Sequence, residues 1–149
     1  MKLRKINNSK NFDFYSADVS CELELPLVEK GISAGFPSPA EDYIDLAIDL
    51  NKELISNPNA TFYGRVKGTS MIDASIFEGD ILVIDKSKEP INGAVAVCFI
   101  DGEFTVKKIK LGKNTCYLMP ANENYKPIKV TEENQFIVWG IVTYIIHKV

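Results

Sequence analysis

The chain turns sharply within Lys67-Gly68-Thr69-Ser70-Met71-Ile72-Asp73, which follows an apolar, strand-like run at 61–67. Gly68 permits a positive φ or a close backbone approach, and Ser70 follows it two residues later in the turn. A second stretch, Phe104-Thr105-Val106-Lys107-Lys108, places a lysine inside an apolar strand pattern. The two stretches predict a β-domain in which a serine turn follows one strand and a lysine lies within another.

Further candidate strands extend from this turn towards the C-terminus. Asp101-Gly102, between two apolar runs, is a strong signal for a two-residue hairpin. Short strands separated by turn residues at this spacing indicate a mainly β fold, a compact domain of mostly antiparallel strands. The expected strands are 61–67, 80–85, 94–100, 103–111, 115–119 and 135–147.

One short helix and an extended N-terminal arm are expected ahead of these strands. Asp49 and the capping box Ser38-Pro39-Ala40-Glu41 are both good helix starts. We favour the start after Asp49, with an end near Asn57-Pro58. The arm shows no sustained helical repeat, and Glu22-Leu23-Glu24-Leu25 alternates as a short strand does. We therefore expect an extended arm that docks on the domain and contains no helix-turn-helix.

The composition is that of an ordinary globular chain without a basic surface. The 149 residues are 46% hydrophobic with a net charge of −3, which fits one domain with a core. A duplex-binding protein normally has a basic footprint, so we expect no direct binding to duplex DNA. No run approaches the roughly 18 apolar residues of a membrane span, and the N-terminus lacks a hydrophobic signal region. We expect no membrane association and a cytoplasmic location.

The cysteines and the histidine offer no metal site and no catalytic triad. Cys21, Cys98 and Cys116 are odd in number and widely spaced, so they predict neither a disulfide framework nor a zinc site. His147 is the only histidine and lies two residues from the end, which argues against a Ser–His–Asp triad. No cofactor and no metal are expected.

Ser70 and Lys107 together suggest a Ser–Lys hydrolase. A serine hydroxyl needs a neighbouring base, and a lysine provides one only when burial lowers its pKa towards neutrality. Strand alternation puts Lys107 on the same face as Thr105 and Ile109, so we prefer it to Lys108 as the base. Thr105 could orient the amine.

The same residues have plainer interpretations when each is taken alone. Ser70 could be an ordinary serine in a glycine-containing turn, and Lys107 could extend its ammonium from a strand edge into solvent. If the turn is catalytic, the backbone N–H groups of Ser70 and Met71 would form the oxyanion hole.

Several segments resemble the LexA/UmuD group of self-cleaving serine peptidases. They are Gly68-Thr69-Ser70-Met71, Glu78-Gly79-Asp80 and the segment 101–108. The upstream Ala34-Gly35-Phe36-Pro37-Ser38-Pro39-Ala40 resembles the cleavage-site region of the UmuD branch more than that of the LexA branch. The resemblance runs from about residue 35 to about residue 146, with the motifs in the family's order and spacing.

The resemblance implies that the chain cuts itself between Ala34 and Gly35 through a Ser70–Lys107 dyad. Residues 1–34 would be an arm removed by cleavage, and 35–149 a peptidase-like β-domain. It also implies a homodimer and an SOS-response role, with the RecA filament on single-stranded DNA as the trigger. The shortened form would serve a translesion DNA polymerase as an accessory subunit, bound to a UmuC-like partner.

Two other functions remain open from the residues themselves. The chain could be a non-catalytic β-domain that binds another protein, with Ser70 and Lys107 incidental. It could also be a repressor fragment from a phage or mobile element, although the charge of −3 and the absence of a helix-turn-helix pattern argue against DNA binding. Composition alone also fits a linker at 31–39.

Overall fold

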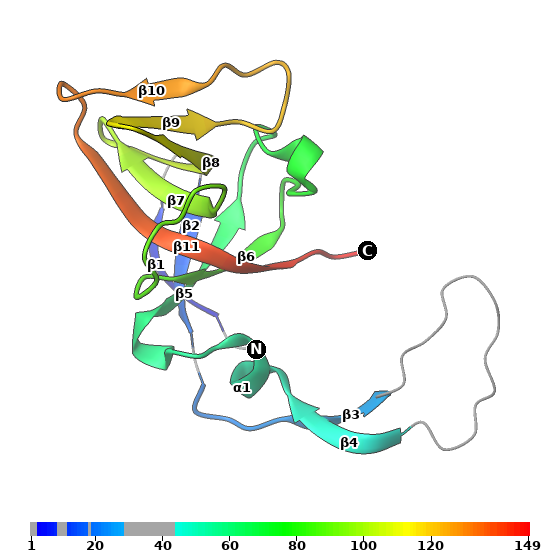
Figure 1. Cartoon of the computed structure of the whole chain (residues 1–149). Helices are drawn as coiled ribbons and strands as arrows, with labels where there is room; N and C mark the ends of the chain where they lie inside the picture. Colours follow the sequence, from blue (N-terminus) through cyan, green and yellow to red (C-terminus); the bar gives the residue numbers. More distant parts are fainter. Residues whose placement is uncertain (1–2, 9–11, 18, 29–43) are drawn as a thin grey trace.

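The computed structural model describes residues 3–8, 12–17, 19–28 and 44–149 (Figure 1). Strands dominate, with one short helix and two 3₁₀ turns, Pro58–Ala60 and Ile72–Ala74. The elements are β1 Leu3–Asn8, β2 Phe12–Ala17, β3 Glu24–Val28, β4 Ile44–Asp49, α1 Leu50–Leu54, β5 Thr61–Val66, β6 Ile81–Asp85, β7 Val95–Ile100, β8 Glu103–Gly112, β9 Thr115–Met119, β10 Ile128–Val130 and β11 Phe136–Ile146.

Nine of these strands form one sheet in the order β1-β2-β5-β6-β11-β7-β8-β9-β10, and every neighbouring pair is antiparallel. A separate two-stranded sheet pairs β3 with β4. The predicted mainly β, mostly antiparallel fold is confirmed, and each of the six expected strands is present within about a residue of its expected bounds. Strand β10 was not expected.

The long strand β11 joins two halves of the large sheet. Its first half pairs with β7 and its second half with β6, so the two halves meet along one strand. The pairing register shifts between Val138 and Gly140 and again between Val142 and Tyr144, and such irregularities bend a strand. Figure 1 shows β7, β8, β9 and β10 turned away from β1, β2, β5 and β6. This bend brings β8 near the end of β5.

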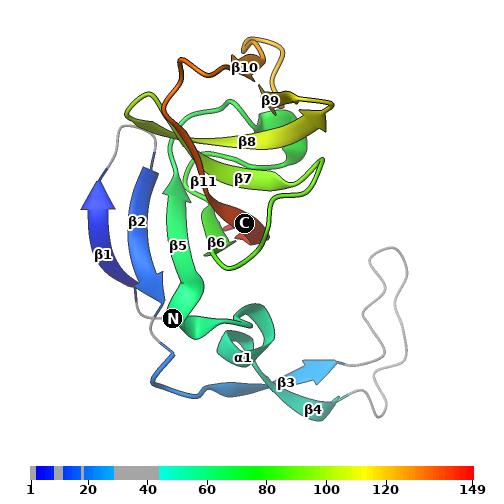
Figure 2. The same cartoon turned by 60° about the vertical axis from the view of Figure 1, so that its left-hand side comes forward.

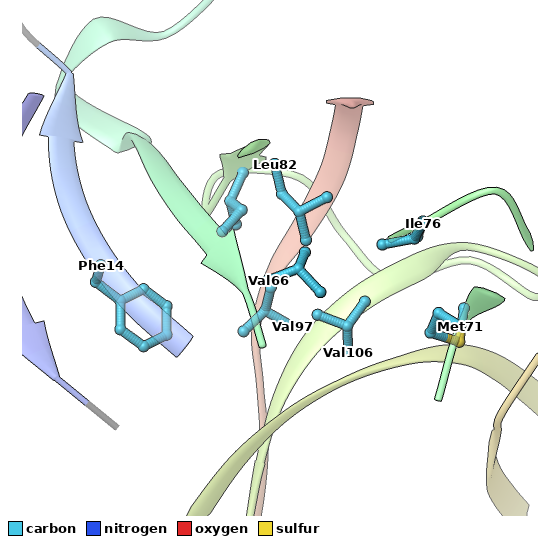
Figure 3. Close-up of a cluster of buried hydrophobic side chains, with 8 residues drawn as sticks. Phe14, Val66, Met71, Ile76, Leu82, Val97 and Val106 are labelled. Atoms are coloured by element: carbon cyan, nitrogen blue, oxygen red, sulfur yellow. The ribbon is translucent and has the colours of Figure 1, made fainter. Parts of the chain in front are cut away.

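Buried side chains from both halves meet in one core (Figure 3). Val66 and Leu82 come from β5 and β6, whereas Val97 and Val106 come from β7 and β8. All four are less than about a tenth exposed. The same cluster contains Phe14, Met71, Ile76 and Ile84. The serine turn and the lysine strand are therefore attached to a shared hydrophobic core.

The short helix begins where the later of the two expected starts placed it. Asp49 is the N-cap, and its Oδ1 accepts a hydrogen bond from the backbone N–H of Asn51 at 2.9 Å. The helix ends earlier than expected because Ile55 is already extended, with φ −118° and ψ 98°. An earlier start is wrong, since Ile44–Asp49 is strand β4. The capping box at 38–41 lies outside the described residues.

The described part of the arm is extended, as expected. β1 and β2 form a hairpin, and β2 pairs with β5 so that the hairpin extends the large sheet (Figure 2). The alternating run at 22–25 overlaps the start of β3. No helix within the described ranges is long and apolar enough to cross a bilayer.

Candidate active site

Strand β5 leads directly into the serine turn. Gly68 has a φ of 91°, a backbone conformation that residues with a Cβ rarely adopt. The turn therefore needs a glycine at this position. Met71 anchors the turn because its side chain is 2% exposed and its carbonyl accepts from the N–H groups of Ala74 and Ile76 at 3.0 and 3.2 Å. The turn therefore holds Ser70 in a fixed, half-buried position beside the core.

A distant loop supports the same turn from the other side. The N–H of Ala121 donates to the carbonyl of Ser70 at 2.8 Å, and the carbonyl of Ala121 accepts from the N–H of Asp73 at 2.7 Å. Asn122 Nδ2 donates to the carbonyl of Thr69 at 2.8 Å. Sequence reasoning missed this support, since the residues after β9 carry only loop signals, and these do not indicate which segment the loop will contact.

Strand β8 places Lys107 inside the protein. Its side chain is 5% exposed, whereas Lys108 is exposed, and Ile109 is buried at 1%. This is the alternation that the sequence predicts. Lys107 is paired with Ala96 of β7, which is itself fully buried. Lys107 therefore does not extend from a strand edge into solvent.

The amine of Lys107 has three close polar neighbours. Its Nζ lies 2.9 Å from Ser70 Oγ, 2.6 Å from Thr105 Oγ1 and 3.0 Å from the carbonyl oxygen of Val106. A neutral amine has two N–H donors and one lone pair. Thr105 and Val106 can accept from the two N–H groups, which leaves the lone pair for the hydroxyl hydrogen of Ser70. The set therefore fits an uncharged amine poised to receive the serine proton.

Burial also changes the acidity of this amine. It lowers the pKa of Lys107 from 10.5 to about 8, because the charged form loses hydration, and the neighbouring Cys98 opposes the shift slightly. Burial raises the pKa of Cys98 to about 12, so this thiol stays protonated near neutral pH. At pH 7 about a tenth of the Lys107 amines are neutral. Some of the Lys107 amines are thus deprotonated at physiological pH, as a general base must be.

A cleft of about 210 Å³ opens over Ser70 and Lys107. Apolar walls come from Val66, Met71 and Ile76, and the hydroxyl of Tyr125 lies 3.4 Å from Thr69 Oγ1 at its rim. In the part of the chain that the structure describes, the N–H groups of Ser70 and Met71 donate to no protein acceptor. These donors remain available to a carbonyl oxygen brought to the serine.

The other residues considered in the sequence lie elsewhere. His147 Nδ1 is 2.6 Å from Asp80 Oδ1 and packs its ring against Phe77, so it has a structural contact away from the dyad. Among the described residues, no three His, Cys, Asp or Glu side chains gather where they could hold a metal ion. Ala34 and Gly35 lie outside the described residues.

The chain is similar to known proteins over most of its length. Residues 26–143 match the family Peptidase S24-like. The chain is 38% identical to the protein MucA of Salmonella typhimurium over 132 residues, which are 88% of this chain and 90% of MucA. It is 43% identical to the protein SamA of the same organism over 123 residues, which are 83% of this chain and 85% of SamA.

The similarity extends to a repressor. The chain is 41% identical to the LexA repressor of Alcanivorax borkumensis over 120 residues, which are 80% of this chain but 57% of that repressor. Both the family match and the MucA and SamA relatives cover most of the chain. The chain therefore belongs to the peptidase S24 family of self-cleaving serine peptidases.

Proposed function

We propose that this chain is a UmuD-like SOS-response protein that cuts itself between Ala34 and Gly35. Ser70 is the nucleophile and Lys107 is the general base. The observation that carries this proposal is the 2.9 Å separation of Ser70 Oγ and Lys107 Nζ, together with the burial of the amine. Among the described residues Lys107 has no carboxylate partner, and a buried lysine without one is costly to maintain; this cost is understandable where the reaction needs a neutral amine.

The reaction begins when neutral Lys107 accepts the hydroxyl proton of Ser70. The oxygen attacks the carbonyl carbon of Ala34, and the N–H groups of Ser70 and Met71 donate to the oxyanion that forms. The Lys107 ammonium then returns its proton to the amide nitrogen of Gly35, and the peptide bond breaks. Ser70 is left as an ester of Ala34, which water hydrolyses with Lys107 again acting as base.

Two features of the site support this assignment. Losing one oxyanion donor typically costs about 10²–10³ in rate, so the two free N–H groups would contribute strongly to the reaction. The cleft over the dyad is small, and a segment with small residues such as Ala34 and Gly35 suits it. A bulky residue at either position would fit less well.

The substrate segment belongs to the same chain, so regulation must act on its position. Closing the loop from Gly35 to Ser70 costs only slightly more free energy than closing a shorter one, because the cost grows with the logarithm of length. We propose that the leader, residues 1–34, rests away from Ser70 most of the time. The RecA filament on single-stranded DNA would shift this population and trigger cleavage.

The shortened product, residues 35–149, would act in the cytoplasm as the accessory subunit of a translesion DNA polymerase, bound to a UmuC-like partner. We further propose that it forms a homodimer. Strand β11 supports this, since three of its apolar side chains are exposed: Ile137 at 62%, Tyr144 at 44% and Ile145 at 40%. Exposed apolar side chains are common at interfaces between subunits.

The test is mass spectrometry of the purified chain held at pH 10 without any partner. We expect two products, one ending at Ala34 and one beginning at Gly35. The Ser70→Ala variant should give neither product while keeping the circular dichroism spectrum of the parent. Products that persist in Ser70→Ala would place the nucleophile elsewhere, and an intact parent chain would favour a binding domain without peptidase activity.

A further inference from the structure

The hairpin of β1 and β2 lies ahead of the family match, which begins at residue 26. It is nevertheless part of the large sheet, because β2 pairs with β5 over five consecutive residues from Phe12 to Ser16. In Figure 2 the three strands lie side by side at one end of the molecule. This hairpin is thus an addition to the peptidase domain that is held by contacts to it.

Phe14 fixes β2 to the core. Its side chain is 2% exposed, and its ring lies 4.7 Å from the rings of both Phe104 and Trp139, measured between centroids. Figure 3 shows it reaching from β2 towards the cluster that contains Val66. The leader therefore contributes one of the buried side chains of the folded domain. Departure of the leader would uncover the apolar rings of Phe104 in β8 and Trp139 in β11 that Phe14 contacts.

An ion pair links the same strand to the serine turn. Asp13 Oδ1 lies 3.0 Å from Lys67 Nζ, and Lys67 directly precedes Gly68. The leader therefore contacts the turn that holds Ser70. A second pairing, β3 with β4, also joins the two sides of the expected cut, but a two-stranded sheet alone is only marginally stable in water.

We propose that cutting between residues 34 and 35 leaves the leader bound, so that the first product is a two-piece complex held by β2 and Phe14. The docking site then consists of the edge of β5 and the rings of Phe104 and Trp139 that Phe14 contacts, and the leader is its occupant. The bond that is cut lies outside both the β2–β5 and the β3–β4 pairing, so cleavage removes the covalent tether and leaves both pairings in place. This proposal rests on the proposed self-cleavage.

Loss of the tether makes the association concentration-dependent. Before the cut, the hairpin rebinds within the same molecule, whereas afterwards a released leader must return from solution. Departure would uncover the backbone of β5 as a free sheet edge, and such edges bind other strands. Release of the leader, rather than bond cleavage, would thus determine when the domain changes its surface.

The test makes the cut by other means. A recognition sequence for a site-specific endoprotease is inserted between residues 34 and 35 of the full chain carrying Ser70→Ala. The sample is cut to completion, as checked on a denaturing gel, and analysed by native mass spectrometry and size exclusion at micromolar concentration. We expect the leader to remain with the domain. Because the cut does not use Ser70, this result does not depend on whether the chain cleaves itself.

Matched truncations in the leader identify the contact that retains it. Phe14→Ala should weaken retention about a hundredfold or more, because replacing a buried phenylalanine by alanine has a large cost. Leu23→Ala removes an apolar side chain that is 62% exposed and should change retention less than about threefold. Trp139 is the only tryptophan and contacts Phe14, so its fluorescence reports release upon dilution.

Two results would overturn the proposal. One is a leader with intact Phe14 that separates from the domain at micromolar concentration as soon as it is cut. The other is equal retention of the Phe14→Ala and Leu23→Ala leaders, which would mean that the docking site lies elsewhere. In either case the self-cleavage assay at pH 10 on the unmodified chain still decides the proposed function separately.

Discussion

Changing the pH should alter the rate of self-cleavage through the protonation of Lys107. If neutral Lys107 is the base, the rate follows the fraction of neutral amine. With a pKa of about 8, that fraction is about a tenth at pH 7 and nearly complete at pH 10. The rate should therefore rise about tenfold over this range and level off above about pH 9.5.

The size of this rise distinguishes a buried base from an exposed one. A hydrated lysine with a pKa near 10.5 would be neutral in only about one molecule in three thousand at pH 7, and the rate would rise several hundredfold by pH 10 without levelling off. The assay follows the loss of intact chain by mass spectrometry in buffers of constant ionic strength. Lys108→Met, which alters the exposed neighbour, should leave the profile unchanged.

Two outcomes would refute this reasoning. A flat profile from pH 7 to about 10.5 would mean that no group with the acidity of Lys107 controls the reaction. A rise that continues past pH 10 would mean that the amine is hydrated in the reactive state, in conflict with its 5% exposure. Ser70→Ala provides the baseline, since fragments that accumulate in this variant at high pH do not come from the dyad.

Three substitutions test the surroundings of the dyad. The lowered pKa of Lys107 means that the folded state carries its full penalty, about 3 kcal/mol, below about pH 8, and that this penalty disappears as the pH rises from about 8 to about 10.5. Lys107→Met should thus abolish cleavage yet raise the unfolding free energy by about 1–3 kcal/mol at pH 7 in urea titrations, with no gain at pH 10.5. Thr105→Val removes an acceptor for the amine and should lower the plateau rate about tenfold without raising the midpoint of the pH profile, whereas an unchanged plateau would show that Thr105 does not orient the amine. Gly140→Ala would place a Cβ 2.5 Å from Ile84 Cγ2 and should destabilise the fold by about 1–3 kcal/mol; a urea midpoint equal to that of the parent would show that β11 adjusts freely there.

The strands and the serine turn could be predicted because their signals are local. Asp101 and Gly102 have φ values of 48° and 85°, as a two-residue hairpin turn requires, and this dipeptide has a strong preference for such turns. Asp49 as the helix cap follows in the same way from its side chain. The buried position of Lys107 follows from strand alternation.

The features that escaped prediction depend on distant partners. Strand β10 is three residues long and is formed by pairing with β9, so its own sequence carries little signal. Ile44–Asp49 has apolar residues at helical spacing but is strand β4, because pairing with β3 overrides a short periodic pattern. The support of the serine turn by Ala121 is a backbone contact between segments far apart in sequence, which residue types do not encode.

The position of β11 at the seam of the sheet has a consequence for protein synthesis. The leader and Ser70 leave the ribosome early, but the two halves of the sheet have no common strand until residues 136–146 have been translated. If Lys107 stays hydrated until that strand has paired, only about one amine in three thousand lacks its proton at pH 7. Self-cleavage through Ser70 and Lys107, as proposed above, would then be slow in a nascent chain, since burial of the amine depends on the nearly finished polypeptide.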